Sequence, residues 1–203
     1  MKQELSKKTR TESDLIGSRE VPESALYGVQ TLRGIENFRI SKFHLNEYPL
    51  FIQALAITKM GAAIANRELD LLTKEQTDAI LKACKEILEG KYRDQFPVDM
   101  IQGGAGTTTN MNANEVIANR ALEHQRGEYQ YCSPNDHVNR SQSTNDAYPT
   151  AIHIGLYYTH LKLVKHFETL IQSFRKKGEE FANIIKMGRT QLEDAVPMTL
   201  GQT

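Results

Sequence analysis

The sequence has no net charge, no long apolar run and no leader-like segment at its start. Its 203 residues hold 25 basic and 25 acidic side chains, and this balance argues against a nucleic-acid or polybasic membrane surface. No apolar run approaches the ~20 residues of a transmembrane helix. The first residues, MKQELSKKTRTESD, lack the apolar core of a signal peptide. We therefore expect a cytoplasmic protein that binds a small molecule or another protein, with no nucleic acid and no membrane as partner.

Motifs for metal and redox chemistry are also missing. Cys84 and Cys132 form no CxxC pair, which fits reduced thiols, and Cys84 lies on an apolar helical stripe typical of a core position. The histidines form no HExxH motif; His153 and His160 could share a helix face but lack an acidic partner. We expect no metal site and no required cofactor, while activation by a divalent metal stays open.

One polar stretch, GGAGTTTNMNANE from Gly103 to Glu115, has the composition of a binding loop. Its glycines let a backbone approach a ligand closely, and its threonines lie where a helix leaves its first N–H groups unpaired. No Lys ends it as in a P-loop, and Thr109 stands where a dinucleotide fingerprint needs a third glycine. The stretch predicts either a turn with a helix cap or a site for a small carboxylate held by neutral donors.

Apolar periodicity predicts four helices and no strand, so the fold class is all-α. The first helix begins at Pro49, a favoured first-turn residue, and ends near residue 69. The second begins at a capping box of Thr73 and Gln76 and ends at Gly90. The third spans about 114–124, closed by Gly127. The fourth begins at Pro149 and runs for roughly thirty residues. Residues 15–38 keep neither period, and we expect them to be ordered but irregular.

The fourth helix carries an apolar stripe at steps of three or four residues, which is typical of a bundle helix. Its members are Ile154, Tyr157, Leu161, Val164, Phe167, Ile171 and Phe174. After a polar segment at 188–191 another helix is expected around Pro197, which leaves the stripe with too few partners in this chain. We therefore expect the N-terminal part of a longer protein. Its parts are a polar tail over 1–13, a small helical domain over 14–146 and the truncated start of a central helical bundle over 147–203.

Three polar loops, GGAGTTTNMNANE, PNDHVNRSQSTNDAYPT and GRTQLEDAVPMTLGQ, follow an early segment VPESALYGVQTLRGIENF. In this order they resemble the substrate-binding segments of the aspartase/fumarase superfamily, from about residue 12 to the end, and the aspartases within it are the most similar. The resemblance implies an all-helical homotetramer that eliminates ammonia from L-aspartate to give fumarate, with each site drawing loops from three subunits. It also implies that the general-base serine, in a loop GSSxMPxKxN, lies beyond Thr203. The fragment alone is then expected to be inactive.

The resemblance assigns substrate-binding roles to six residues. Thr107, Ser143 and Thr144 are similar to the hydroxyl groups that hold the β-carboxylate, where charge develops when a proton leaves C3. The residues that orient the amino group and the other carboxylate are Asn145, Thr190 and Gln191.

Two departures from the family pattern matter. Gln191 stands where fumarases and some aspartases carry His, and it resembles a variant found among aspartases, which shifts the balance toward them. Ser133 stands where fumarases often carry a His in a secondary anion site beside Asn135 and Asp136, so that second site is not expected here. Two alternatives remain: a fumarate hydratase, whose loops bind malate in the same way, and a non-catalytic helical assembly domain in which the Ser, Thr and Asn clusters are only caps and turns.

Overall fold

The computed structural model describes residues 8–123 and 129–203. The chain divides into two compact units, Met1–Leu156 and Tyr157–Thr203, which are described one at a time. Helices dominate, as the all-α prediction requires, and the strands are confined to two small antiparallel hairpins. The predicted domain boundaries stay predictions.

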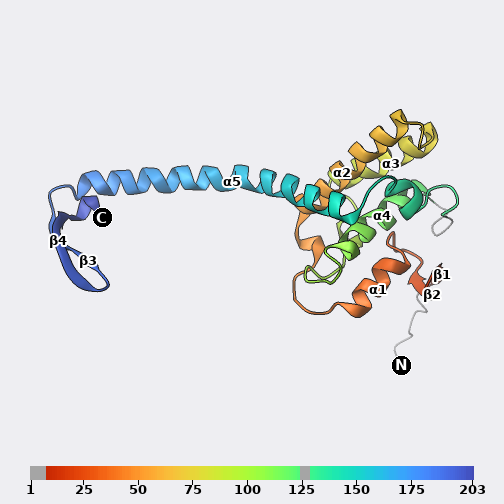
Figure 1. Ribbon diagram of the computed structural model, residues 1–203, viewed down its shortest axis with the longest axis horizontal. Helices are drawn as coiled ribbons and strands as arrows, with labels where there is room; N and C mark the ends of the chain where they lie inside the picture. The colour runs from red at the N-terminus through yellow and green to blue at the C-terminus, as the bar shows by residue number, and fades with distance from the viewer. Residues whose placement is uncertain (1–7, 124–128) are drawn as a thin grey trace, which may run out of the picture. The chain divides into compact units, whose positions relative to one another are not determined.

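The first unit is built on three helices that lie side by side, α2 (Pro49–Glu68), α3 (Lys74–Leu88) and α4 (Thr107–Ala121) (Figure 1). Two of the predicted helices are confirmed almost to the residue. Pro49 occupies the first turn of α2, where its missing N–H costs nothing. Thr73 and Gln76 form the reciprocal capping box of α3. Gly90 follows α3 with a φ of 86°, the left-handed conformation that glycine adopts without strain.

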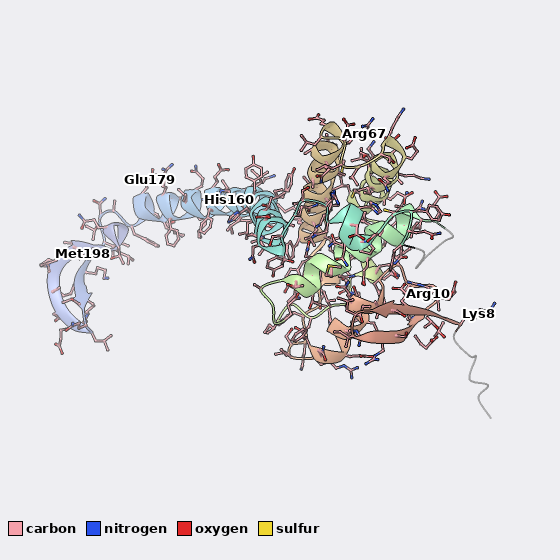
Figure 2. The ribbon with its side chains drawn as sticks, turned by 45° about the vertical axis from the view of Figure 1, so that its right-hand side comes forward. Lys8, Arg10, Arg67, His160, Glu179 and Met198 are labelled. Carbon is pink, nitrogen blue, oxygen red and sulfur yellow. The ribbon has the colours of Figure 1, made fainter. Side chains whose placement is uncertain are left out.

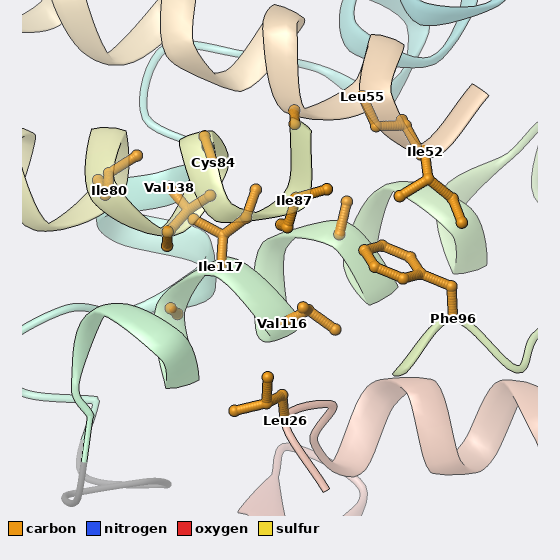
Figure 3. Packing of buried hydrophobic residues seen from close by; sticks show 14 of the residues in the cluster. Leu26, Ile52, Leu55, Ile80, Cys84, Ile87, Phe96, Val116, Ile117 and Val138 are labelled. Atoms are coloured by element: carbon orange, nitrogen blue, oxygen red, sulfur yellow. The ribbon is translucent and has the colours of Figure 1, made fainter. Parts of the chain in front are cut away.

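The core of the first unit lies where these helices meet (Figure 3). Ile52 and Leu55 of α2, Ile87 of α3 and Val116 of α4 are buried, and Phe96 closes the cluster from the loop before α4. Cys84 is fully buried among them, which confirms its predicted core position. Burial of a large apolar side chain stabilises the fold by about 1.5–3 kcal/mol, so this cluster supplies the main driving force for the unit.

A β-hairpin stands where the sequence analysis expected a polar tail and an irregular segment. Strands β1 (Thr9–Asp14) and β2 (Gly17–Pro22) pair antiparallel. The strand period was missed because Val21 is the one apolar side chain of these strands that is buried, and the buried residue of β1 is the charged Glu12. Arg10 neutralises Glu12 at 2.6 Å and also donates to the Ala25 and Tyr27 carbonyls.

Helix α1 (Val29–Asn37) was also missed. Its first N–H groups are capped from distant segments: Glu115 of α4 accepts from the backbone N–H of Gly28, Gln30 and Thr31 at 2.8–3.0 Å, and Glu12 accepts from that of Val29. Burial raises the pKa of Glu115, and the three N–H donors oppose the rise. A helix whose caps come from other elements, most of them from a residue more than eighty positions away, carries no local start signal.

Two helices begin earlier than predicted. Helix α4 starts at Thr107 instead of Asn114, because the polar Thr and Asn side chains that obscured its period are themselves buried. It ends at Ala121, and the predicted terminator Gly127 lies outside the described residues. Helix α5 (Thr144–Glu180) starts five residues before Pro149. Three one-turn 3-10 helices, η1 (Leu45–Glu47), η2 (Arg93–Gln95) and η4 (Leu200–Gln202), and the π-helical turn η3 (Pro134–Val138) complete the chain.

In the second unit, residues 157–180 of α5 are followed by strands β3 (Ile185–Thr190) and β4 (Glu193–Thr199). The helix expected around Pro197 is wrong: Pro197 lies in β4 opposite Met187. The side chains of α5 around His160 and Glu179 project away from the helix (Figure 2). Most of the apolar stripe on residues 157–180 is exposed, with 61% at Tyr157 and 70% at Phe174, and Val164 is half-buried. Within the described residues, no helix combines the length and the apolar character needed to cross a membrane.

Candidate functional site

The glycine-rich loop leads directly into α4. Gly104 and Gly106 have φ of 75° and 91°, and Ala105 between them is also positive at 51°, a backbone path that is strained for most residues other than glycine. Gln102 caps the helix from the loop, accepting from the N–H of Thr109 and donating to its Oγ1 at 2.8 and 2.9 Å. The loop is thus a capped helix start with a left-handed backbone path, and its binding role stays a prediction.

Thr107, the first residue of α4, is exposed. Its Oγ1 donates to the carbonyl oxygen of Gly104 at 2.6 Å. A substrate carboxylate at this position would compete with that carbonyl for the hydroxyl proton, because a threonine hydroxyl has one proton to donate.

Tyr148 packs the glycine-rich loop onto the start of α5. A Cβ added at Gly106 would lie 2.4 Å from the Tyr148 ring, so no side chain fits there. Tyr148 in turn makes an edge contact with Phe51 of α2, with ring centroids 5.7 Å apart. Two of the polar loops singled out in the sequence are therefore held together within the first unit.

The second loop ends at the start of α5 with Ser143, Thr144 and Asn145. Ser143 caps the helix, since its Oγ accepts from the Asn145 N–H at 3.1 Å and its own N–H donates to Asp146. Thr144 Oγ1 accepts from Asn110 Nδ2 of α4 at 3.1 Å. In both hydroxyl groups the oxygen is used as an acceptor, which leaves the O–H proton to be donated elsewhere. This is the arrangement that a bound carboxylate needs.

A partly buried polar network links that loop to α2 and α4. Asn139 Oδ1 accepts from Lys59 Nζ at 2.9 Å, from Asn110 at 3.1 Å and from Asn114 at 3.2 Å. Lys59 also donates to Gln142 Oε1 at 3.0 Å. The network ties α2 and α4 to the segment immediately before Ser143, so it determines where the hydroxyl groups of that segment lie.

Lys59 is the residue of this network that sequence reasoning missed. Its side chain is fully buried, and burial lowers its pKa to about 7 because the charged amine is removed from water. The hydrogen-bond partners of Lys59 Nζ are neutral amides. A signal was available, because Ile52, Leu55, Lys59 and Ala63 follow the helical spacing of the buried face of α2.

The third loop belongs to the second unit. Thr190 ends β3 and pairs with Glu193, and the two residues between them, Gln191 and Leu192, both have positive φ, 49° and 67°. Such turns favour Asn-Gly, so this pair carries backbone strain of about 1–3 kcal/mol per residue. Gln191 and Thr190 are exposed. The structure therefore groups Thr107, Ser143, Thr144 and Asn145 in the first unit and leaves Thr190 and Gln191 in the other.

A cavity of about 790 Å³ borders α4 at Thr108 and is lined by Arg33, Ser133 and Asn135. Its arginine is already paired with Asp14 at 2.8 Å, and Ser133 caps η3 by exchanging hydrogen bonds with Asp136. The predicted substrate residues do not line this cavity. Within the described part of the chain, no three His, Cys, Asp or Glu side chains gather as metal ligands would.

Comparison with known proteins identifies the family. The family described as Lyase matches residues 17–203. An aspartate ammonia-lyase from Pseudomonas canavaninivorans is 59% identical over 95% of this chain and 41% of its own length. A Brucella melitensis structure described as fumarate lyase:delta crystallin bound to cobalt is 52% identical, with a TM-score of 0.87 over 96% of this chain and 43% of that one. A class II fumarase from Schistosoma mansoni is 39% identical, with a TM-score of 0.77 over 96% and 42%.

The match runs along the N-terminal part of these proteins, and the chain spans about two fifths of their length. Identity above half across nearly the whole chain, together with a shared fold, excludes coincidence. The chain belongs to the Lyase family, in the aspartase/fumarase superfamily.

Proposed function

We propose that the full-length protein carrying this chain is an aspartate ammonia-lyase, which reversibly eliminates ammonia from L-aspartate to give fumarate in the cytoplasm. The observation that carries the proposal is the 59% identity to a protein of that name across 95% of the chain. The free hydroxyl protons of Ser143 and Thr144 support it, since both oxygens already accept within the protein.

The chemistry assigns each group a task. Loss of the C3 proton drives charge onto the β-carboxylate, and hydroxyl donors aimed at that charge are worth roughly 3 kcal/mol each when they act as oxyanion-hole donors. Thr107, Ser143 and Thr144 are the proposed donors. Asn145, Thr190 and Gln191 are the proposed partners of the amino group and the second carboxylate. The elimination needs a base and such donors but no cofactor.

We propose a homotetramer for the full-length protein. The apolar side chains along α5, about half exposed at Leu161 and Phe167 and more at Phe174, support this, because a monomer in water rarely exposes so long an apolar surface. Sedimentation of the full-length protein at micromolar concentration tests the proposal, and a monomer would contradict it.

Two assays of the full-length protein separate the proposed function from its alternatives. We expect ammonia release from aspartate to exceed water loss from malate, and the reverse ratio would identify a fumarate hydratase instead. In crystals of the full-length protein soaked with aspartate, we expect density beside Thr107 and Ser143. Empty density there, together with no turnover of either substrate, would favour a non-catalytic assembly domain.

A further inference from the structure

Asn110 lies near the start of α4 and is buried. Its amide nitrogen donates twice: Nδ2 lies 3.1 Å from Thr144 Oγ1 and 3.1 Å from Asn139 Oδ1. Its Oδ1 is also buried and has no hydrogen-bond partner among the residues that the structure describes. Buried polar atoms without a partner are rare in proteins, because each costs free energy. The nitrogen is thus the side of this amide that the fold uses.

The partners of Asn139 fix the direction in which these hydrogen bonds run. Asn139 Nδ2 donates to the main-chain carbonyl oxygen of Gln142 at 3.0 Å, and a carbonyl can only accept. Asn139 must therefore present its other amide atom, Oδ1, to Lys59 and Asn110. Because Oδ1 can only accept, Asn110 must present its nitrogen. Reversing the Asn110 amide would place two amide oxygens 3.1 Å apart.

Thr144 Oγ1 is consequently held as an acceptor by Asn110. A threonine hydroxyl has a single proton, which rotates to suit its surroundings. With the oxygen accepting from Asn110, that proton points away from Asn110, and none of the described residues accepts it. Thr144 is half-buried in the first turn of α5, so a carboxylate bound there can accept the proton.

We propose that Asn110 is a positioning residue of the elimination: its side-chain nitrogen holds the oxygen of Thr144 and thereby turns the Thr144 hydroxyl proton toward the β-carboxylate of the substrate. The inference rests on the proposed ammonia-lyase function and adds to it a residue that touches no substrate and acts through Thr144. Without the amide, the hydroxyl is free to rotate, and only part of the molecules present the proton when charge develops on the carboxylate.

A double-mutant cycle in the full-length protein tests the proposal. In Asn110→Ala we expect kcat for aspartate to fall about three- to tenfold, as for the loss of one hydrogen bond, with little change in KM, because the donor matters most in the transition state. In a Thr144→Val background the same change should lower kcat no further, since two residues that act as a unit are not additive. Asn110→Leu, which fills the space that a water molecule could occupy, should give the same result.

Asn112→Ala is the matched control. Asn112 is fully buried in the same helix and its Oδ1 likewise lacks a partner among the described residues, but its Nδ2 donates to the carbonyl of Gln95. We expect a comparable fall in the thermal midpoint with kcat equal to that of the wild type.

Two results would overturn the inference. One is additive losses of kcat for Asn110→Ala and Thr144→Val in an active wild-type background. The other is a kcat in both Asn110 variants that equals that of Asn112→Ala. A wild-type protein that released no ammonia from aspartate would instead contradict the proposed function itself, and this inference with it.

Discussion

The two units of the chain differ in what they bury. In the first unit a lysine is fully buried and held by Asn139 and Gln142. In the second unit Phe174 is 70% exposed and Leu192, at the hairpin tip, 92%. A buried amine must be hydrogen-bonded to be tolerated, whereas an exposed apolar stripe needs a partner surface. The first unit thus has a core of its own, whereas most of the apolar stripe in the second unit is exposed.

The largest effect should come from isolating the chain. We expect the 203-residue polypeptide alone to eliminate no ammonia from aspartate, because losing a general base costs roughly 10²- to 10⁴-fold and losing the positioning of other groups adds to that. Fumarate formation followed by ultraviolet absorbance measures this. The second unit should drive self-association, seen by light scattering. Turnover equal to that of the full-length protein would contradict the expected inactivity. A stable monomer at micromolar concentration would contradict the expected self-association.

Lys59→Met should test how far the first unit depends on its polar network. The methionine keeps the apolar stem but removes the donor of Gln142 Oε1, whereas Asn139 Oδ1 keeps Asn110 and Asn114 as donors. An acceptor left unpaired inside the protein costs about 1–3 kcal/mol. We expect a fall of about 1–3 kcal/mol in the free energy of unfolding, measured by denaturant titration. Lys82→Met on α3 is the control, since that lysine pairs with Glu123 at the surface and should cost under 1 kcal/mol. Equal losses of unfolding free energy in Lys59→Met and Lys82→Met would show that the hydrogen bonds of Lys59 do not stabilise the first unit.

Because Lys59 is buried, we also expect the stability of the protein to depend on pH. The folded-state pKa of Lys59 is lowered to about 7 by burial, while that of an unfolded lysine is about 10.4. Between these values the unfolded chain holds more protons, so this group makes stability rise with pH, by at most about 1.4 kcal/mol per unit. The slope should disappear in Lys59→Met, and identical slopes in both proteins would show that Lys59 does not titrate there.

Thr144→Val in the full-length protein should lower kcat/KM for aspartate by roughly 10- to 100-fold, because the swap is nearly isosteric and removes only the hydroxyl. The loss of the acceptor for Asn110 Nδ2 is the structural side effect, so the thermal midpoint is measured alongside. Thr150→Val is the control: its hydroxyl donates to the Asp146 carbonyl on the exposed side of the same helix. Unchanged kcat/KM in Thr144→Val would remove that hydroxyl from the site.

The smallest effect concerns the second unit. Gln191→His should retain activity but add an inflection between about pH 5 and 8 to the pH–rate profile, because His titrates in that range and Gln does not. Superimposable profiles for the two proteins would argue against contact between Gln191 and substrate.

Helices with local signals could be predicted, and those without could not. Pro49, Thr73 and Gly90 mark the ends of α2 and α3 in the sequence itself. Helix α1 is capped by Glu12 and Glu115, which come from other elements, and the first hairpin buries a charged residue where an apolar one is usual. The second hairpin turns through Gln191 and Leu192 without glycine, so no turn signal was present.

The sequence by itself determined the helical class, the two capped helices and the polar loops, because each depends on the spacing of neighbouring residues. Tertiary structure decided which of those loops lie together. Gly106 against Tyr148 and Asn110 against Thr144 join segments more than thirty residues apart, and Lys59 becomes a buried support only once α2 packs against Asn139. Contacts of this kind depend on packing and burial across the unit, and local spacing cannot encode them.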